Sequence, residues 1–180
     1  MPHFWHIAER WLGIRARARL TCTIFQTTLQ NMKVVLQRVT QANVTVEAPA
    51  YTASIGRGVV VLVGITQTDT NAQAEWMARK IANLRIFPAL DGKSSFDRSL
   101  IEVGGAVLCV SQFTLYGEVN KGRRPDFIQA AKPDVAAPLI DYFVAQLRVQ
   151  GLSVESGVFG ADMQVALVND GPVTLILEAL

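Results

Sequence analysis

Histidine is almost absent from this sequence of 180 residues. Both histidines, His3 and His6, lie close to the first residue, and none follows between Met32 and Leu180. A Ser-His-Asp or Cys-His catalytic arrangement therefore cannot be assembled within residues 32–180. Zinc catalysis that depends on histidine ligands is excluded there for the same reason. An enzyme built from these residues must obtain its proton transfers from another group, and the substrate itself is one source.

Cysteine is equally scarce, because the chain has only Cys22 and Cys109. Two cysteines do not form a disulfide framework, and the composition is typical of a protein in a reducing, cytosolic compartment. Cys109 lies in an apolar run, where a buried and inert thiol is more common than a nucleophile. No apolar run reaches the roughly 18 residues that a membrane span needs. We therefore expect a cytoplasmic protein without a membrane partner.

The net charge is small, at +2, and it is unevenly distributed. Residues 1–31 carry four arginines and one glutamate, a balance of +3. Residues 32–180 carry 13 basic and 14 acidic side chains, a balance of −1. Any contact of this larger part with nucleic acid must therefore depend on a local basic patch and not on a global field.

Residues 1–31 differ in composition from the remainder and allow three interpretations. They resemble a transit peptide in being rich in arginine and poor in acids. Several of their apolar side chains could share one face of a helix at a membrane surface. The third interpretation is an upstream extension, with translation beginning at Met32. We favour the third, because a strand is predicted from residue 33 onward, and we expect an extension outside the fold over 1–31 and one domain over 32–180.

Two amphipathic stretches predict the longer helices. Apolar side chains at helical spacing indicate a helix over 70–84, with Asp69 as its N-cap. A second helix begins at Pro133 and ends at Gly151, and it accommodates Pro138 only within its first turn. The other expected elements are strands at 33–39, 43–47, 51–55, 59–65, 85–87, 106–110, 153–156 and 164–168, a last strand after 172, and one or two helical turns at 126–132.

This order of elements mostly lacks the strand–helix alternation of a parallel sheet. About eight strands and two longer helices therefore predict an α+β fold with largely antiparallel sheet. A chain of this length, half of it hydrophobic, is long enough to bury the core of one domain.

The stretch at 164–177, QVALVNDGPVTLIL, contains a proline between two apolar runs. Pro172 cannot donate a hydrogen bond to a neighbouring strand, so it belongs at an edge, a bulge or a turn. Asn169, Asp170 and Gly171 precede it and tolerate positive φ. Two interpretations are open at this point: a hairpin turn, or a rigid backbone loop that forms part of a binding site.

A second notable stretch follows the strand predicted at 106–110. Strand alternation would place Ser111 and Phe113 on one face and Gln112 and Thr114 on the other. A basic loop, KGRRP, comes next at 121–125, and its proline suits the first position of a helix.

Six stretches are specific when they occur together in one order: MKVVLQRV at 32–39, KIANLRIF at 80–87, SQFTL at 111–115, KGRRP at 121–125, GVFGADM at 157–163 and NDGPVT at 169–174. With them, the sequence resembles the D-aminoacyl-tRNA deacylase family, of the D-Tyr-tRNA deacylase type, from Met32 to the last residue. It departs from the family pattern at 94–96, where relatives more often carry Met-Asn, and in the segment 1–31.

The resemblance implies an enzyme that hydrolyses the ester between a D-amino acid and the 3′ end of a tRNA. It also implies activity on glycine mischarged on tRNA(Ala), a homodimer, and no metal or cofactor. The expected fold is a compact single α+β domain, with mostly antiparallel sheets in a barrel-like arrangement and two longer helices.

The resemblance assigns roles around a chiral filter. The bond between Gly171 and Pro172 would be cis, and its loop would enter the pocket of a second subunit and reject L-amino acids. Arg38 would hold that loop across the dimer interface. The carbonyl groups of Met163 and Gly171 would bind the substrate ammonium, and Phe159 would contact the terminal adenine.

On the ester side, the resemblance implies that Ser111, Gln112, Phe113 and Thr114 line the pocket and that the Phe113 amide stabilises the oxyanion. Such a site uses backbone groups and the 2′-hydroxyl of the terminal ribose, so it needs no histidine. A backbone donor aimed at a developing oxyanion contributes roughly 2.7–4 kcal/mol.

Two other functions are open. A non-catalytic RNA-binding module would need a stronger basic face than the balance of −1 provides. An esterase for another substrate would need Thr114 or Cys109 as its nucleophile, without a base beside it. Arg123 and Arg124 form an ordinary solvated loop by themselves, and they become phosphate contacts if the substrate is tRNA.

Overall fold

The computed structural model describes residues 31–179, and a single long strand, β1 (Lys33–Val46), organises its sheet. β1 pairs antiparallel with β6 (Gln164–Glu178) on one edge. On its other edge it pairs first with β3 (Gly58–Gly64) and then with β2 (Tyr51–Ile55), both antiparallel. The two strands expected at 33–39 and 43–47 are therefore one element, because β6 pairs with both halves.

The other half of the sheet is parallel. β4 (Ala106–Ser111) pairs parallel with β3, and β5 (Ser153–Ser156) pairs parallel with β4. Each connection contains one α-helix, which returns the chain to the end of the sheet where the parallel strands begin. The expectation that strands and helices do not alternate is wrong for this part, because β3–α1–β4 and β4–α2–β5 are crossover units. The expected antiparallel pairing is found for all three neighbours of β1.

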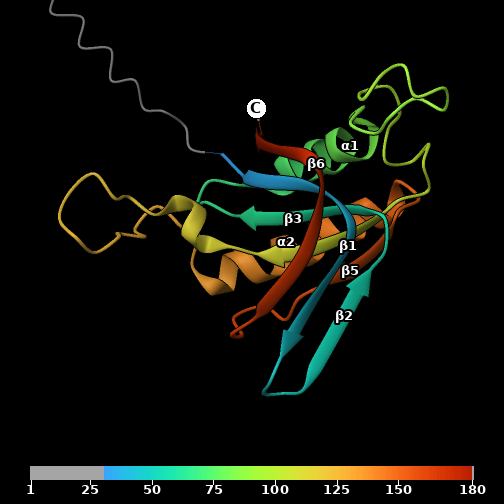
Figure 1. Ribbon diagram of the computed structural model, residues 1–180. Helices are drawn as coiled ribbons and strands as arrows, with labels where there is room; N and C mark the ends of the chain where they lie inside the picture. The colour runs from blue at the N-terminus through green and yellow to red at the C-terminus, as the bar shows by residue number, and fades with distance from the viewer. Residues whose placement is uncertain (1–30, 180) are drawn as a thin grey trace, which may run out of the picture.

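The sheet curls into a nearly closed barrel. Its strand order is β2-β1-β3-β4-β5, with β6 on the second edge of β1. The terminal strands of this path approach each other, and the hydroxyl of Tyr51 in β2 donates a hydrogen bond of 2.8 Å to the carbonyl of Ser156 in β5. Figure 1 shows β2 and the far half of β1 extending together from the body of the molecule. The predicted α+β domain with a barrel-like sheet and two longer helices is confirmed.

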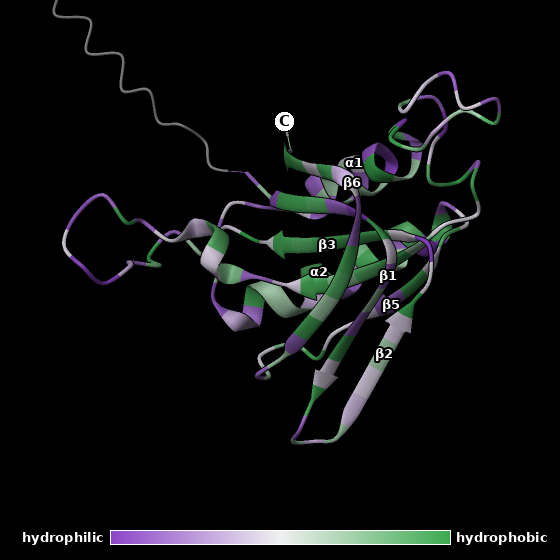
Figure 2. Ribbon diagram, in the orientation of Figure 1, coloured by the Kyte–Doolittle hydropathy of each residue, from purple (hydrophilic) through white to green (hydrophobic). Residues whose placement is uncertain are grey.

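Helices α1 (Asn71–Asn83) and α2 (Pro133–Val149) cover one face of the barrel wall. Their apolar stripes pack on the outward side chains of β3 and β4, while the alternate side chains of these strands fill the barrel interior. Figure 2 shows this pattern as apolar strands and helix faces beside hydrophilic loops. No helix within residues 31–179 combines the length and the apolar character that crossing a membrane requires.

The N-cap of α1 is Thr70 and not Asp69. Thr70 and Gln73 form a capping box, in which the Thr70 hydroxyl accepts a hydrogen bond from the helix backbone. Asp69 is buried instead, and its two carboxyl oxygens accept hydrogen bonds of 2.8 Å from the N–H groups of Met32 and Thr66. Burial raises the pKa of the Asp69 carboxyl, and these two hydrogen bonds act in the opposite direction.

Three local predictions are wrong. The stretch at 85–87 forms no strand, and only an isolated bridge joins Phe87 to Arg98. Residues 126–132 form two isolated bridges and a turn but no helix, because their backbone groups bond to neighbouring loops. Pro138 is the sixth residue of α2, beyond the first turn. Gly151 ends the helix as expected, with φ of +86°.

We expected residues 1–31 to be an extension outside the fold. Of this segment, only Asn31 belongs to the described residues. His3, His6 and Cys22 also lie outside them.

Candidate functional site

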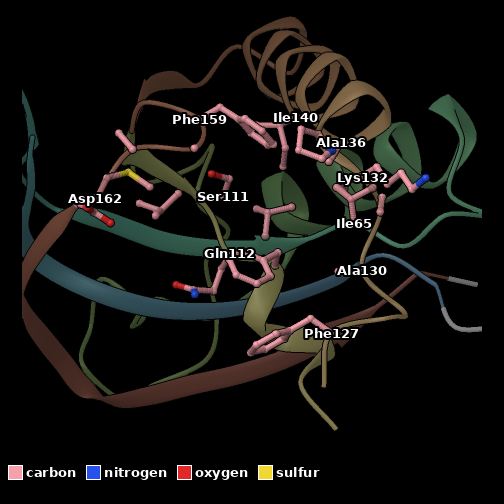
Figure 3. Close-up of a pocket in the computed structure, with 18 of the residues that line it drawn as sticks. Ile65, Ser111, Gln112, Phe127, Ala130, Lys132, Ala136, Ile140, Phe159 and Asp162 are labelled. Carbon is pink, nitrogen blue, oxygen red and sulfur yellow. The ribbon is translucent and has the colours of Figure 1, made fainter. Parts of the chain in front are cut away.

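A cavity of about 600 Å³ lies at the carboxyl ends of β3 and β4. The carboxyl ends of parallel strands are the usual position for a ligand, because the chain leaves the sheet there in loops. Helix α2 forms one wall, and the loop at 157–163 forms another (Figure 3). Its lining residues include Val63, Ile65, Ser111, Gln112, Phe113, Phe127, Lys132, Ala136, Ile140, Phe159 and Met163.

The backbone after β4 turns sharply at this cavity. The N–H of Gln112 donates a hydrogen bond of 2.7 Å to Val63, so the pairing with β3 continues by one residue. The chain then forms a 3-10 helix, η1 (Phe113–Tyr116), where the sequence predicted further strand. Gly64 permits this turn, because a Cβ on Gly64 would lie 3.0 Å from the Tyr116 ring and 3.3 Å from the Gln112 carbonyl.

Tyr116 anchors η1 to the beginning of β1. Its hydroxyl donates a hydrogen bond of 2.5 Å to the Asn31 carbonyl, and the Lys33 ammonium lies 5.1 Å from the centre of its ring. Burial raises the pKa of the Tyr116 hydroxyl, and the nearby carboxylates Asp69 and Glu178 raise it further. The hydroxyl therefore stays protonated and available as a donor.

The Phe113 N–H is an unpaired donor at the cavity. The first N–H groups of a helix have no partner within it. The structure gives the Phe113 N–H no acceptor among residues 31–179. The Phe113 side chain lines the cavity and is 56% exposed. This backbone N–H can donate a hydrogen bond to a ligand oxygen without the loss of an existing hydrogen bond.

Gln112 and Thr114 are linked to each other across η1. The Gln112 side-chain amide donates a short hydrogen bond to the Thr114 hydroxyl. Thr114 is exposed and does not line the cavity. The sequence predicted that these two side chains share one face of a strand. They do lie side by side, but the turn of η1 brings them together and there is no strand at this point. No basic side chain among the described residues hydrogen-bonds to Thr114.

The loop at 157–163 brings Phe159 and Met163 to the cavity. The Gly157 N–H donates a hydrogen bond of 2.9 Å to the Cys109 carbonyl, which extends the pairing between β5 and β4 by one residue. Gly157 also leaves room for the Met163 sulfur, which would lie 2.4 Å from a Cβ at that position. Phe159 is 38% exposed at the cavity wall.

The stretch at 169–174 is an excursion within β6 and not a hairpin turn. Thr174 pairs with Gln37 and Asn169 pairs with Val39, so four residues of β6 lie opposite Arg38 alone. Both halves of β6 bind β1, whereas a hairpin would pair them with each other. The bond between Gly171 and Pro172 is cis.

Two side chains close the base of this excursion. The Arg38 Nε donates a hydrogen bond of 2.9 Å to the Asp170 carbonyl and lies 3.1 Å from an Asp170 carboxyl oxygen. Asn169 donates to the carbonyl groups of Arg38 and Val173, at 2.9 and 3.2 Å. Gly171 and Pro172 are exposed and do not line the cavity of their own chain.

The single chain thus gathers only part of the predicted site. Ser111, Gln112, Phe113, Phe159 and Met163 line one cavity. The residues that do not line it are Thr114, Arg38, Gly171, Pro172, Arg123 and Arg124.

Sequence reasoning missed part of the cavity wall. Ala136 and Ile140 line the cavity from α2. They lie four residues apart, so their spacing indicated only that they face the hydrophobic core. Phe127 and Lys132 come from a stretch predicted as a helix. Within the part of the chain that is described, no three His, Cys, Asp or Glu side chains are placed to hold a metal ion.

The fold and the cavity define a small α+β barrel protein with a ligand site beside a backbone donor. Residues 35–178 match the family described as D-Tyr-tRNA(Tyr) deacylase. A D-aminoacyl-tRNA deacylase of Thermomicrobium roseum is 57% identical over 148 residues, which cover 82% of this chain and 94% of the relative. A relative from Exiguobacterium sibiricum with the same name is 58% identical over 147 residues, covering 82% and 99%.

A solved structure agrees with the sequence comparison. The c-Myc DNA unwinding element binding protein has a TM-score of 0.74 and 45% sequence identity, over 82% of this chain and 99% of that chain. The chain belongs to the D-Tyr-tRNA(Tyr) deacylase family and is a hydrolase.

Proposed function

We propose that this hydrolase cleaves the ester bond between a D-amino acid and the 3′ end of a tRNA, and that it leaves L-aminoacyl-tRNA intact. The unpaired Phe113 N–H at the cavity is the observation that carries the proposal, because ester hydrolysis needs a donor where the oxyanion develops. The names of the relatives support the same substrate. Because aminoacyl-tRNA is used in the cytoplasm, we place the activity there.

The reaction begins when water attacks the ester carbonyl carbon. The Phe113 N–H stabilises the negative charge on the carbonyl oxygen, with Ser111 and Gln112 beside it. The bond from the carbonyl carbon to the ribose oxygen then breaks, and that oxygen takes up the proton that the attacking water gives up. The 2′-hydroxyl of the ribose assists the proton transfer. The products are the free D-amino acid and tRNA, and no side chain forms a covalent intermediate.

The loop at 157–163 contacts both the amino acid and the adenine. The Met163 carbonyl binds the substrate ammonium, and the Phe159 ring contacts the terminal adenine. Glycine on tRNA(Ala) is also hydrolysed, because a substrate without a side chain meets no obstacle in this space. Arg123 and Arg124 bind phosphates of the tRNA.

Chiral selection comes from the excursion of a second copy of the chain. The excursion does not line the cavity of its own chain. Among residues 31–179, β6 pairs with β1 alone, and its other edge carries the exposed Val168 and Ile176. A long open edge of this kind favours pairing with another surface. In the dimer, the Gly171 carbonyl completes the ammonium site, and rigid backbone stands where an L side chain would lie. Arg38 holds this backbone in place.

The activity is tested with D-Tyr-tRNA, L-Tyr-tRNA and an aryl ester on the full chain. We expect hydrolysis of D-Tyr-tRNA alone, and far slower hydrolysis when the tRNA ends in 2′-deoxyadenosine. Ser111→Ala, Thr114→Ala and Cys109→Ala should each retain measurable turnover. Binding of tRNA without hydrolysis would identify an RNA-binding module. A trapped acyl group on Thr114 or Cys109 would identify an esterase with a side-chain nucleophile.

The dimeric site is tested by mixing two inactive variants. Gly171→Ala damages the excursion, because its Cβ would lie 2.2 Å from the Val173 N atom. Ala161→Trp fills the cavity that Ala161 lines. A mixed dimer pairs one intact cavity with one intact excursion, so mixing should restore about a quarter of the wild-type activity. Light scattering that shows a fully active monomer would contradict the shared site.

A further inference from the structure

An exposed hairpin-like arm, residues 118–126, projects beside the cavity and carries three cations. Figure 1 shows it as the long loop between η1 and α2. We call it the basic arm, because its outer part holds Lys121, Arg123 and Arg124. All three are exposed, and no ion pair joins them to a carboxylate within residues 31–179.

The base of the basic arm is closed by backbone hydrogen bonds. The N–H of Glu118 donates to the Asp126 carbonyl at 2.8 Å, and the N–H of Asp126 donates to the Glu118 carbonyl at 3.0 Å. The Asp126 carboxylate accepts a further hydrogen bond of 2.7 Å from the Ile128 N–H. The two ends of the arm are therefore held together where the arm leaves the protein.

Phe127 follows the arm and packs against both ends of η1. Its ring contacts the Phe113 ring edge to face, with centroids 5.0 Å apart and an interplanar angle of 72°. The same ring covers Gly117, since a Cβ there would lie 3.1 Å from a Phe127 ring carbon. Figure 3 places Phe127 at the cavity below Gln112. One aromatic side chain thus contacts the first residue of η1 and the residue that caps it.

The segment after Phe127 is fixed to the loop that follows β3. The Thr66 hydroxyl donates a hydrogen bond of 2.9 Å to the Gln129 carbonyl, and the Gln67 amide donates one of 3.1 Å to the Ile128 carbonyl. The Ala131 N–H donates to the Ile65 carbonyl at 2.9 Å. Phe127 therefore lies between the closed base of the arm and a clamped segment, and its backbone has little freedom.

We infer that Phe127 is a positioning residue for the reaction, which holds η1 so that the Phe113 N–H faces the ester. The η1 turn is only one helical turn long, and such a turn is marginal without packing. The Phe127 ring supplies that packing from the side of the basic arm. This role rests on the proposed function, since it concerns the donor assigned there to the oxyanion.

The test compares Phe127→Leu, Phe127→Tyr and a matched control, Phe96→Leu, in the full chain. Phe96 is 57% exposed and does not line the cavity. The substrates are D-Tyr-tRNA and D-tyrosyl-adenosine, which lacks the phosphates that the arm binds. Phe127→Leu should lower kcat about tenfold on both substrates with KM nearly unchanged. Phe127→Tyr keeps the ring and should restore kcat, and Phe96→Leu should behave as wild type.

A second measurement separates this role from the proposed function. Amide hydrogen exchange of Gly117, whose N–H donates to the Thr114 carbonyl at 3.0 Å in the η1 turn, should be faster in Phe127→Leu than in the wild type, with exchange at Val110 unchanged. An unchanged kcat with only a lower melting temperature, a rise in KM alone, or unchanged exchange at Gly117 would each overturn the positioning role. A wild type that fails on D-Tyr-tRNA would overturn the proposed function, and the exchange result would still decide the role of Phe127.

Discussion

The guanidinium of Arg38 fixes the backbone of Asp170, which lies 132 positions further along the chain. Arg38 is only 6% exposed, and it also donates to the Ile86 carbonyl. One buried cation therefore joins β1, the excursion of β6 and the segment after α1. The excursion is held by the same strand that organises the sheet.

Replacing Arg38 with Met should destabilise the protein by about 3 kcal/mol, because it leaves buried acceptors without a donor. Arg57→Met is a matched control. Arg57 lies 5.4 Å from the Phe87 ring centre, much as Arg38 does at 5.9 Å, but it is exposed. Urea unfolding measures both variants. An equal loss of stability in the two variants would contradict the prediction, because it would show that the contact with the Phe87 ring, and not the buried hydrogen bonds, stabilises the protein.

Gly58→Ala should destabilise the protein by about 2–4 kcal/mol, because the added methyl collides with backbone that cannot retreat. A Cβ on Gly58 would lie 1.9 Å from the carbonyl oxygen of Ala106, its parallel partner in β4. Gly56→Ala is the control, since no atom lies within 4 Å of its added Cβ. The measurement is thermal unfolding of both variants. A Gly58 variant as stable as the Gly56 variant would contradict the parallel register of β3 and β4.

Pro138→Ala should stabilise α2 by about 1–2 kcal/mol. Proline inside a helix removes one hydrogen bond and strains the preceding turn, and part of the gain is lost to greater freedom of the unfolded chain. Pro133→Ala is the control, because Pro133 occupies the first position of α2, where no such bond exists. Calorimetry of both variants checks the difference. A decrease in stability for Pro138→Ala would refute the prediction.

Cys109 should resist alkylation in the folded protein. Burial raises the pKa of its thiol to about 12, so almost no thiolate forms at pH 8. Iodoacetamide treatment of a Cys22→Ser variant isolates this thiol, and modification should follow global unfolding in urea. Rapid modification of the native protein would show that the thiol is accessible.

The same thiol contributes a pH dependence of stability. Its ordinary pKa is 9.0, so between pH 9 and about 12 it ionises in the unfolded chain but not in the folded one. The free energy of unfolding should therefore fall as the pH rises through this range. In Cys109→Ala this part of the decrease should be missing, and an identical pH profile would count against the assignment.

Residue types and the motifs that carry the family resemblance located part of the site. The absence of histidine after His6 excluded common hydrolytic arrangements. The apolar spacing of α1 and α2 fixed their faces, because helical periodicity is a property of neighbouring residues. The stretches at 111–115 and 157–163 contain five predicted site residues, and all five line the cavity.

Only the tertiary structure decided how distant segments pair. The apolar runs of β3, β4 and β5 are compatible with parallel or antiparallel neighbours, and the crossover helices select the parallel arrangement. The stretch SQFTL has strand-like alternation, yet Gly64 admits a 3-10 turn there. The run around Pro172 reads as two strands and a turn, and only its pairing with β1 shows one strand with an excursion that Arg38 holds. Strand pairing is set by contacts between residues far apart in the chain, and local periodicity contains no information about the partner.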